Sequence, residues 1–224
     1  MTFSIAGRCA RTGQFGVAVS SSSPAVAARC AWARAGVGIA CTQNITDPSL
    51  GPRLLDAMEA GQTATDALRL VTADASFIEY RQLTALDRSG ASAGRNGKHV
   101  LGIHHIASAQ DVIAAGNLLA NRSVPDRMVT AFQDRVADDL GDRMLYAMQA
   151  ALAAGGEEGP VHSVGMLIVD KVSWPTTDLR VDWSDDPIGD LARLWDLWKP
   201  QAPAYLQRAL DPREAPSYGV PGDE

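Results

Sequence analysis

Several polar residues with chemical potential follow the third apolar segment of the chain, where strand-like alternation gives way to helical spacing. Gln43, Asn44 and Asp47 lie between a predicted strand and a predicted helix. The first turn of a helix presents unpaired N–H groups and a partial positive charge, so polar side chains beside it suit an anionic substrate or an oxyanion. Asp47, which precedes Pro48, is also explained as a helix N-cap. Gln43 has no such structural explanation and is the stronger candidate.

Arg81 is a further candidate on its chemistry alone. A guanidinium group can bind a substrate carboxylate through two parallel hydrogen bonds, or it can pair with an acidic residue on the surface. Asn44, Asp47 and Arg81 are therefore the predicted substrate-binding residues.

No metal or cofactor site is indicated. His104 and His105 are adjacent, so on a strand they point to opposite faces and cannot share a metal. Gly36-x-Gly38 lacks the third glycine and the following helix of a dinucleotide site. No spacing resembles a zinc site, an EF-hand or a phosphate loop. We expect no cofactor and no metal.

Composition narrows the class of protein. The 224 residues suffice for one substantial core, and a net charge of -6 argues against a nucleic-acid surface. No segment approaches the ~18 apolar residues of a membrane span, and the N-terminus does not resemble a signal peptide. The three cysteines are expected to be buried, reduced thiols. A cytoplasmic protein that acts on a small molecule is therefore expected, with no nucleic-acid or membrane partner.

The predicted strands and helices, which must position these residues, are grouped along the chain and do not strictly alternate. Alternating apolar residues predict strands at 2–8, 14–20, 36–42, 81–87, 100–106, 112–117, 163–169 and 179–183. Helical spacing predicts helices at 48–60, 63–73, 124–137, 140–154 and 187–198. Blocks of strands and helices favour an α+β fold, with two antiparallel sheets face to face and helices on both outer sides.

A single domain is expected over residues 1–210, with an irregular tail rich in proline and glycine at 211–224. The aromatic residues Trp183, Trp195, Trp198 and Tyr205 are interpreted as core or, preferably, as a subunit interface. The chain is accordingly expected to form a homo-oligomer.

An ordered set of short motifs runs along the chain. The set comprises Gly16-Val17-Ala18-Val19, Trp32-Ala33-Arg34-Ala35-Gly36, Thr42-Gln43, Asp47-Pro48-Ser49, Tyr80-Arg81-Gln82-Leu83, Gly116-Asn117 and Asp178-Leu179-Arg180-Val181-Asp182. It resembles the domain-of-unknown-function 1028 family, DUF1028, which is placed in the N-terminal-nucleophile (Ntn) hydrolase superfamily. The resemblance covers nearly the whole chain and implies a four-layer αββα sandwich.

The resemblance also implies a chemistry. Ntn hydrolases use a Thr, Ser or Cys at the mature N-terminus, whose own α-amine is the general base. A free α-amine has a pKa of about 7.7–8.0, so it can accept a proton near neutral pH. Removal of Met1, which is general when the next residue is small, would expose Thr2 as nucleophile and base in one residue. Thr2 is otherwise explained as a β-branched residue that opens a strand.

Two more residues enter through the resemblance. Ser21 matches a family serine, lies beside Thr2 if strands 2–8 and 14–20 pair, and could donate to an oxyanion or simply satisfy backbone at the strand end. Asn117 falls in the family's Gly-Asn pair and is an oxyanion candidate or a turn residue. Ser22 stands where the family usually has a basic residue, and the loop 156–160 also lacks the family's basic residues.

Thr2, Ser21, Gln43 and Asn117 are thus the predicted catalytic set. They predict a cofactor-independent amidohydrolase for a small polar amide or ureido compound. The alternative is a non-catalytic protein of the same fold that binds a metabolite or serves in an assembly.

Overall fold

Alternating residues at the start of the chain form an antiparallel hairpin, as predicted. In the computed structural model, which describes residues 1–223, β1 (Thr2–Arg8) pairs with β2 (Phe15–Ser21). This hairpin is the centre of a six-stranded antiparallel sheet with the order β10-β9-β2-β1-β8-β7. The other four strands are β7 (His105–Ala109), β8 (Val112–Asn117), β9 (Ser163–Val169) and β10 (Thr177–Val181).

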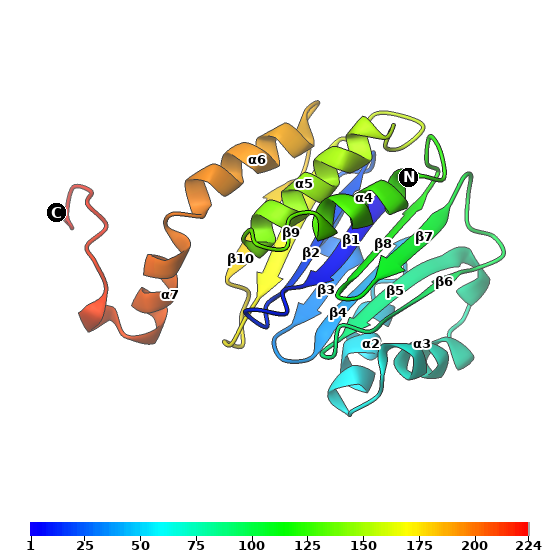
Figure 1. Cartoon of the computed structure of the whole chain (residues 1–224), viewed down its shortest axis with the longest axis horizontal. Helices are drawn as coiled ribbons and strands as arrows, with labels where there is room; N and C mark the ends of the chain where they lie inside the picture. Colours follow the sequence, from blue (N-terminus) through cyan, green and yellow to red (C-terminus); the bar gives the residue numbers. More distant parts are fainter. Residues whose placement is uncertain (224) are drawn as a thin grey trace.

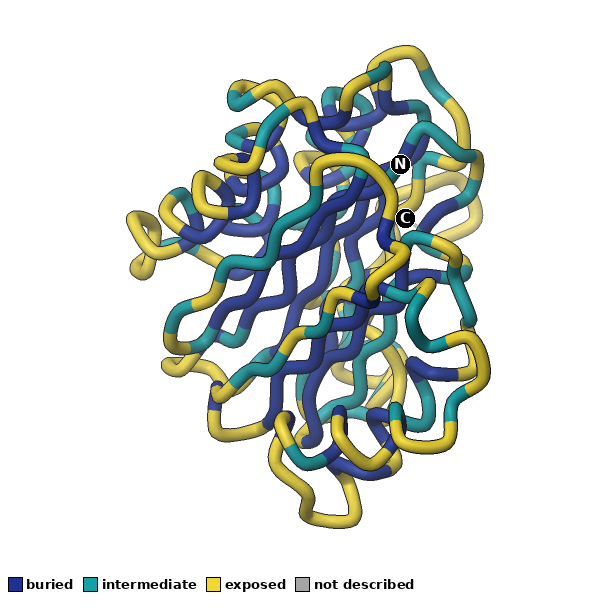
Figure 2. The backbone as a smooth tube through the Cα atoms, turned by 90° about the vertical axis from the view of Figure 1, so that its right-hand side faces the viewer, coloured by how far each residue is buried: buried dark blue, intermediate teal, exposed yellow. Residues whose placement is uncertain are grey.

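A second, four-stranded antiparallel sheet faces the first. Its order is β3-β4-β5-β6, and its strands are β3 (Ala31–Arg34), β4 (Gly38–Asn44), β5 (Arg81–Asp87) and β6 (Ser92–Asn96). Apolar residues of both sheets meet between them, among them Ala6, Phe15, Ile39, Leu86 and Ile113. Figure 2 shows these central strands as buried, with exposed backbone confined to the periphery.

Helices cover the outer face of each sheet (Figure 1). The large sheet is covered by α4 (Val124–Gln133) and α5 (Leu140–Ala153), and the small sheet by α2 (Leu50–Glu59) and α3 (Ala64–Ala73). Separate apolar clusters lie under each helix pair. The predicted α+β sandwich, with four layers in the order αββα, is therefore confirmed.

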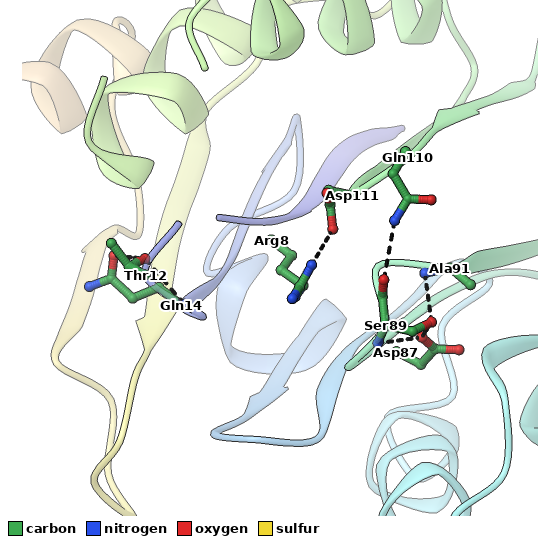
Figure 3. Close-up of polar contacts among 8 residues, drawn as sticks. All are labelled: Arg8, Thr12, Gln14, Asp87, Ser89, Ala91, Gln110 and Asp111. Atoms are coloured by element: carbon green, nitrogen blue, oxygen red, sulfur yellow. Dashed lines mark hydrogen bonds and ion pairs between the residues drawn. The ribbon is translucent and has the colours of Figure 1, made fainter. Parts of the chain in front are cut away.

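One end of the sandwich is closed by short polar turns (Figure 3). Arg8 Nη1 lies 2.7 Å from Asp111 Oδ1, and Gln110 Nε2 donates to the carbonyl oxygen of Ser89 at 3.1 Å. Asp87 Oδ1 accepts both the N–H and the hydroxyl of Ser89. These contacts satisfy turn backbone groups and tie the hairpin of the small sheet to the large sheet.

Several boundaries differ from the sequence-based expectation. The short helix α1 (Ala27–Cys30) and strand β3 were not predicted, because the small residues around Trp32 show neither period. Strand β6 was also not predicted, and the strand predicted at 100–106 is wrong over 100–104, because β7 begins at His105. Helix α2 begins at Leu50, so Asp47 is not its N-cap. The predicted strand at 179–183 is β10, two residues earlier.

The C-terminal part contains more helix than predicted. Helix α6 (Pro187–Trp198) matches the prediction, but α7 (Ala202–Leu210) follows it, and none of its residues is buried. Short 3₁₀ turns occur at Ile78–Tyr80 and Pro212–Glu214.

The three cysteines, Cys9, Cys30 and Cys41, are buried thiols, as predicted. Among residues 1–223, no helix has the length and apolar character needed to cross a membrane.

Candidate functional site

The inward-facing side chains of the central strands change from apolar to polar toward the end of the sandwich opposite the turns of Figure 3. Inward residues on a strand are two apart, and on β1 they run Ala6, Ser4, Thr2. The equivalent series are Val17-Val19-Ser21, Ile113-Ala115-Asn117, Ile39-Cys41-Gln43 and Leu86-Thr84-Gln82. All the polar members are buried. Burial of so many polar groups costs free energy unless they are hydrogen-bonded, so this polar cluster is the candidate site.

Gln82 is the centre of the polar cluster. Its Oε1 accepts hydrogen bonds from Gln43 Nε2 at 2.6 Å and from Asn117 Nδ2 at 3.0 Å. Its Nε2 donates to the carbonyl oxygen of Gly116 at 2.9 Å and to Asn96 Oδ1 at 2.8 Å. Two predicted residues from different sheets, Gln43 and Asn117, are thereby joined through a third that was not predicted.

Thr2 lies beside this network. It begins β1 directly opposite Asn117 in β8. Thr2 Oγ1 is 2.5 Å from the carbonyl oxygen of Met1 and 3.5 Å from Ser21 Oγ. Ser21 Oγ donates to the same Met1 carbonyl and accepts the N–H of Ser23 at 3.1 Å. The four predicted catalytic residues thus lie at one end of the sandwich, with Thr2 and Ser21 converging on one carbonyl oxygen.

Glu157 is a buried acidic residue at the same end of the sandwich. Its exposed fraction is only 4%, and its Oε2 accepts the N–H of Ser22 at 3.2 Å. Within residues 1–223, its Oε1 has no hydrogen-bond partner. Burial raises the pKa of Glu157 to about 7, while the nearby α-ammonium of Met1 acts in the opposite direction. A backbone bridge from Glu157 to Leu119 holds this loop next to the end of β8.

Asn44 and Arg81 lie next to the polar cluster, but they bind main chain. Asn44 has a positive φ of 73°; its Nδ2 donates to the carbonyl oxygen of Tyr80 at 2.7 Å, and its Oδ1 accepts the N–H of Leu101 at 3.2 Å. Arg81 Nη1 donates to the carbonyl oxygen of Ile45. In this structure both side chains therefore hold the connection that leaves β4.

Asp47 has a similar local role. Its Oδ1 accepts the N–H of Ser49 at 3.1 Å and the hydroxyl of Ser49 at 2.7 Å, which forms a turn ahead of α2. Its carbonyl oxygen accepts the hydroxyl of Thr42 at 3.1 Å. The structure thus separates the predicted residues into an inner cluster and an outer group of Asn44, Asp47 and Arg81 that shapes the adjoining loop.

A cavity of about 280 Å³ lies elsewhere, at the far ends of β2 and β9. It is lined by residues that include Gln14, Ile168, Trp195 and Leu206, none of which belongs to the polar cluster. In the described part of the chain, no three His, Cys, Asp or Glu side chains are grouped as metal ligands.

Sequence reasoning missed Ser4, Gln82 and Glu157. A signal for the first two was present, because Ser4 is two residues from Thr2, and Gln82 extends the inward series of Thr84 and Leu86. Glu157 had no such signal. It follows Gly155 and Gly156, whose positive φ values of 110° and 60° turn the chain back toward β8, and this return is a tertiary feature.

The fold and site define an αββα protein with a buried polar cluster at the start of its first strand. The chain belongs to DUF1028, a family of unknown function, whose model matches residues 2–191. It is similar to protein SPO2555 from Silicibacter pomeroyi, a DUF1028 crystal structure, with 32% identity, 89% of each chain covered and a TM-score of 0.80. Anbu (ancestral beta-subunit) from Yersinia bercovieri aligns at 11% identity over 92% of this chain and 97% of that chain, with a TM-score of 0.38. No curated protein matches the sequence.

Proposed function

We propose that the protein is an Ntn-type amidohydrolase that acts on a small polar amide or ureido compound after Met1 has been removed. The observation that carries the proposal is the position of Thr2, whose hydroxyl lies within the polar cluster one peptide bond from Met1. Loss of that one residue would convert the Thr2 amide nitrogen into an α-amine beside the Thr2 hydroxyl. Nucleophile and base would then be adjacent without movement of the strands.

In the proposed reaction, Thr2 Oγ1 attacks the carbonyl carbon of the substrate while the Thr2 α-amine takes the hydroxyl proton. The C–N bond breaks, the leaving nitrogen takes that proton, and an ester to Thr2 remains. Water then attacks the ester with the α-amine again as base, which releases the acid and restores Thr2. The net reaction is amide plus water to carboxylic acid plus amine.

Ser21 and Asn117 are the proposed oxyanion donors. Ser21 Oγ already donates to a carbonyl oxygen attached to Thr2, that of Met1. Asn117 lies opposite Thr2, and its Nδ2 donates to Gln82 Oε1. To donate to an oxyanion, Nδ2 would have to give up this hydrogen bond to Gln82. Gln43, bonded to Ser4 and Gln82 on both ends of its amide, is proposed to position this set.

The test compares two chains that differ only in the state of the Thr2 amine. One is released from an N-terminal fusion so that it begins at Thr2, and the other carries a single additional glycine before Thr2. Release of ammonia from a panel of small amides and ureido compounds is measured for both. We expect turnover only in the chain that begins at Thr2, its retention in Thr2→Ser, and its loss in Thr2→Ala. Equal turnover in the glycine-extended chain would overturn the mechanism.

We infer a small-molecule enzyme of the cytoplasm that forms a homo-oligomer. Support for association comes from large apolar side chains exposed near the C-terminus, including Trp183 at 60% and Leu197 at 65%. The intact mass of the untagged protein from its native host reports whether Met1 is removed; retention of Met1 would favour a non-catalytic metabolite-binding protein.

A further inference from the structure

Met1 makes the contacts with Thr2 and Ser21 that a substrate of Thr2 would have to replace. Its carbonyl oxygen accepts hydrogen bonds from the hydroxyls of Thr2 and Ser21. Its side chain packs toward Gly159, where an added Cβ would come within 3.2 Å of Met1 Cε. Glu157 Oε2 accepts the N–H of Ser22, the residue after Ser21, so the carboxyl group of Glu157 lies beside the contact between Ser21 and Met1. The α-ammonium of Met1 lowers the pKa of that carboxyl group, as a positive charge does.

Two buried acceptors of the polar cluster lack a hydrogen-bond partner. Within the described residues these are Glu157 Oε1 and Asn117 Oδ1; in the adjoining loop, the donor Arg81 Nε also has none. A buried carboxylate oxygen without a donor is costly, and this burial raises the pKa of Glu157 to about 7. A bound ammonium group would supply the missing donor and favour the charged form of Glu157. The free acceptor of Glu157 lies next to the Ser21–Met1 contact, which favours a ligand that brings an N–H donor to this position.

We propose that the site selects amides of α-amino acids, with Glu157 as the residue that holds the substrate's α-ammonium. This inference rests on the proposed function and names its substrate class. In Met1 the ammonium nitrogen is two bonds from the carbonyl carbon, the same relation as in an amino-acid amide. Hydrolysis of such an amide would form the Thr2 ester as the C–N bond breaks, and water would then give the free amino acid and ammonia.

Binding can be measured on a chain that cannot turn the ligand over. We would use the Thr2→Ala chain without Met1 and compare L-methioninamide with N-acetyl-L-methioninamide by calorimetry at neutral pH, where most α-amines are protonated. The two ligands differ in the charge on one nitrogen and in the acetyl group that this nitrogen carries in the second; the Glu157→Gln comparison below separates the two effects. We expect L-methioninamide to bind at least about tenfold more tightly, the effect of one hydrogen bond to a charged group.

Glu157→Gln, introduced into the same chain, should abolish this preference. Glu158→Gln is the matched control, since it removes the same charge from the exposed neighbouring residue and should leave the preference intact. Because each preference is a ratio within one variant, a general weakening of the site does not affect it. Absence of binding by L-methioninamide, or an unchanged preference in Glu157→Gln, would overturn the inference. Failure of the proposed function would be seen separately, as absent turnover in the chain that begins at Thr2.

Discussion

Gln82 uses every hydrogen-bonding group of its side-chain amide. Two donors reach Oε1 and two acceptors take Nε2–H, and these partners come from β4, β6 and β8. Gln82 therefore links the two sheets where the space between them is polar, a role that Leu86 and its apolar neighbours fill at the other end. A network with so many mutual partners is stabilising only while it is complete.

Substitution of Gln82 by Leu should lower the free energy of unfolding by about 2–4 kcal/mol, because buried groups of Gln43, Asn117 and Gly116 lose their partner. Urea denaturation measures this change. Asn96→Ala serves as the control, since Asn96 is an exposed end of the same network and should cost less than about 1 kcal/mol. Equal losses in the two variants would contradict the central role of Gln82.

Glu157 should make stability fall as pH rises. Burial raises its pKa from the usual 4.5 to about 7 in the folded protein, so between these values the folded state keeps a proton that the unfolded state releases. This contribution is complete below about pH 4.5 and is lost as pH rises through about 7. Glu157→Gln removes this titration. The free energy of unfolding of the variant, minus that of the unmodified protein, should therefore rise by up to about 3 kcal/mol between pH 4.5 and about 7.

Denaturation in urea at several pH values, with Glu158→Gln as the exposed control, tests this linkage. The comparison between variants cancels the titration of all other groups. A difference between Glu157→Gln and the unmodified protein that stays constant with pH would show that Glu157 is not a protonated buried acid.

At the scale of elements, periodicity predicted the parts that are buried on one face. The hairpin of β1 and β2 and the helix pair α2 and α3 follow directly from spacings of two and of three to four. Prediction failed where a contact distant in sequence decides the structure, as it does for Trp32 in β3, which packs on α2. The residues of the site were also predictable only in part. Thr2, Ser21 and Asn117 were predicted from family motifs, whereas the position of Glu157 depends on a loop that turns back toward β8.

Gly51 in α2 gives a test of the contact between β3 and α2. A Cβ at this position would lie 2.0 Å from Trp32 Cδ1. Alanine normally favours a helix over glycine by about 1 kcal/mol, yet here we expect Gly51→Ala to lower the free energy of unfolding by about 1–3 kcal/mol. The additional change Trp32→Leu should recover part of that loss, and a double-mutant cycle in urea measures the coupling. A stabilised Gly51→Ala would show that Trp32 moves aside without cost.

At the scale of the whole molecule, α6 packs on the large sheet through Ile188, Leu191 and Trp195, whereas α7 and the residues after it extend away from the sandwich (Figure 1). The match to the family ends at residue 191, within α6. Helix α7 contacts α6 through the rings of Tyr205 and Trp198, which are 5.1 Å apart. The residues from 212 to 223 are exposed except for the half-buried Ala215. Among the described residues, none from 212 onward belongs to the apolar clusters of the layers or to the polar cluster.

Two truncations locate the C-terminal boundary of the domain. Removal of residues 211–224 should change the free energy of unfolding by no more than about 0.5 kcal/mol, because the described residues of this segment bury almost no side chain. Removal from residue 202 onward takes α7 as well and uncovers Trp198, so it should cost about 1–2 kcal/mol. Urea denaturation followed by circular dichroism distinguishes the two. A large loss from the first truncation would move the boundary beyond residue 210 and make the tail part of the folded unit.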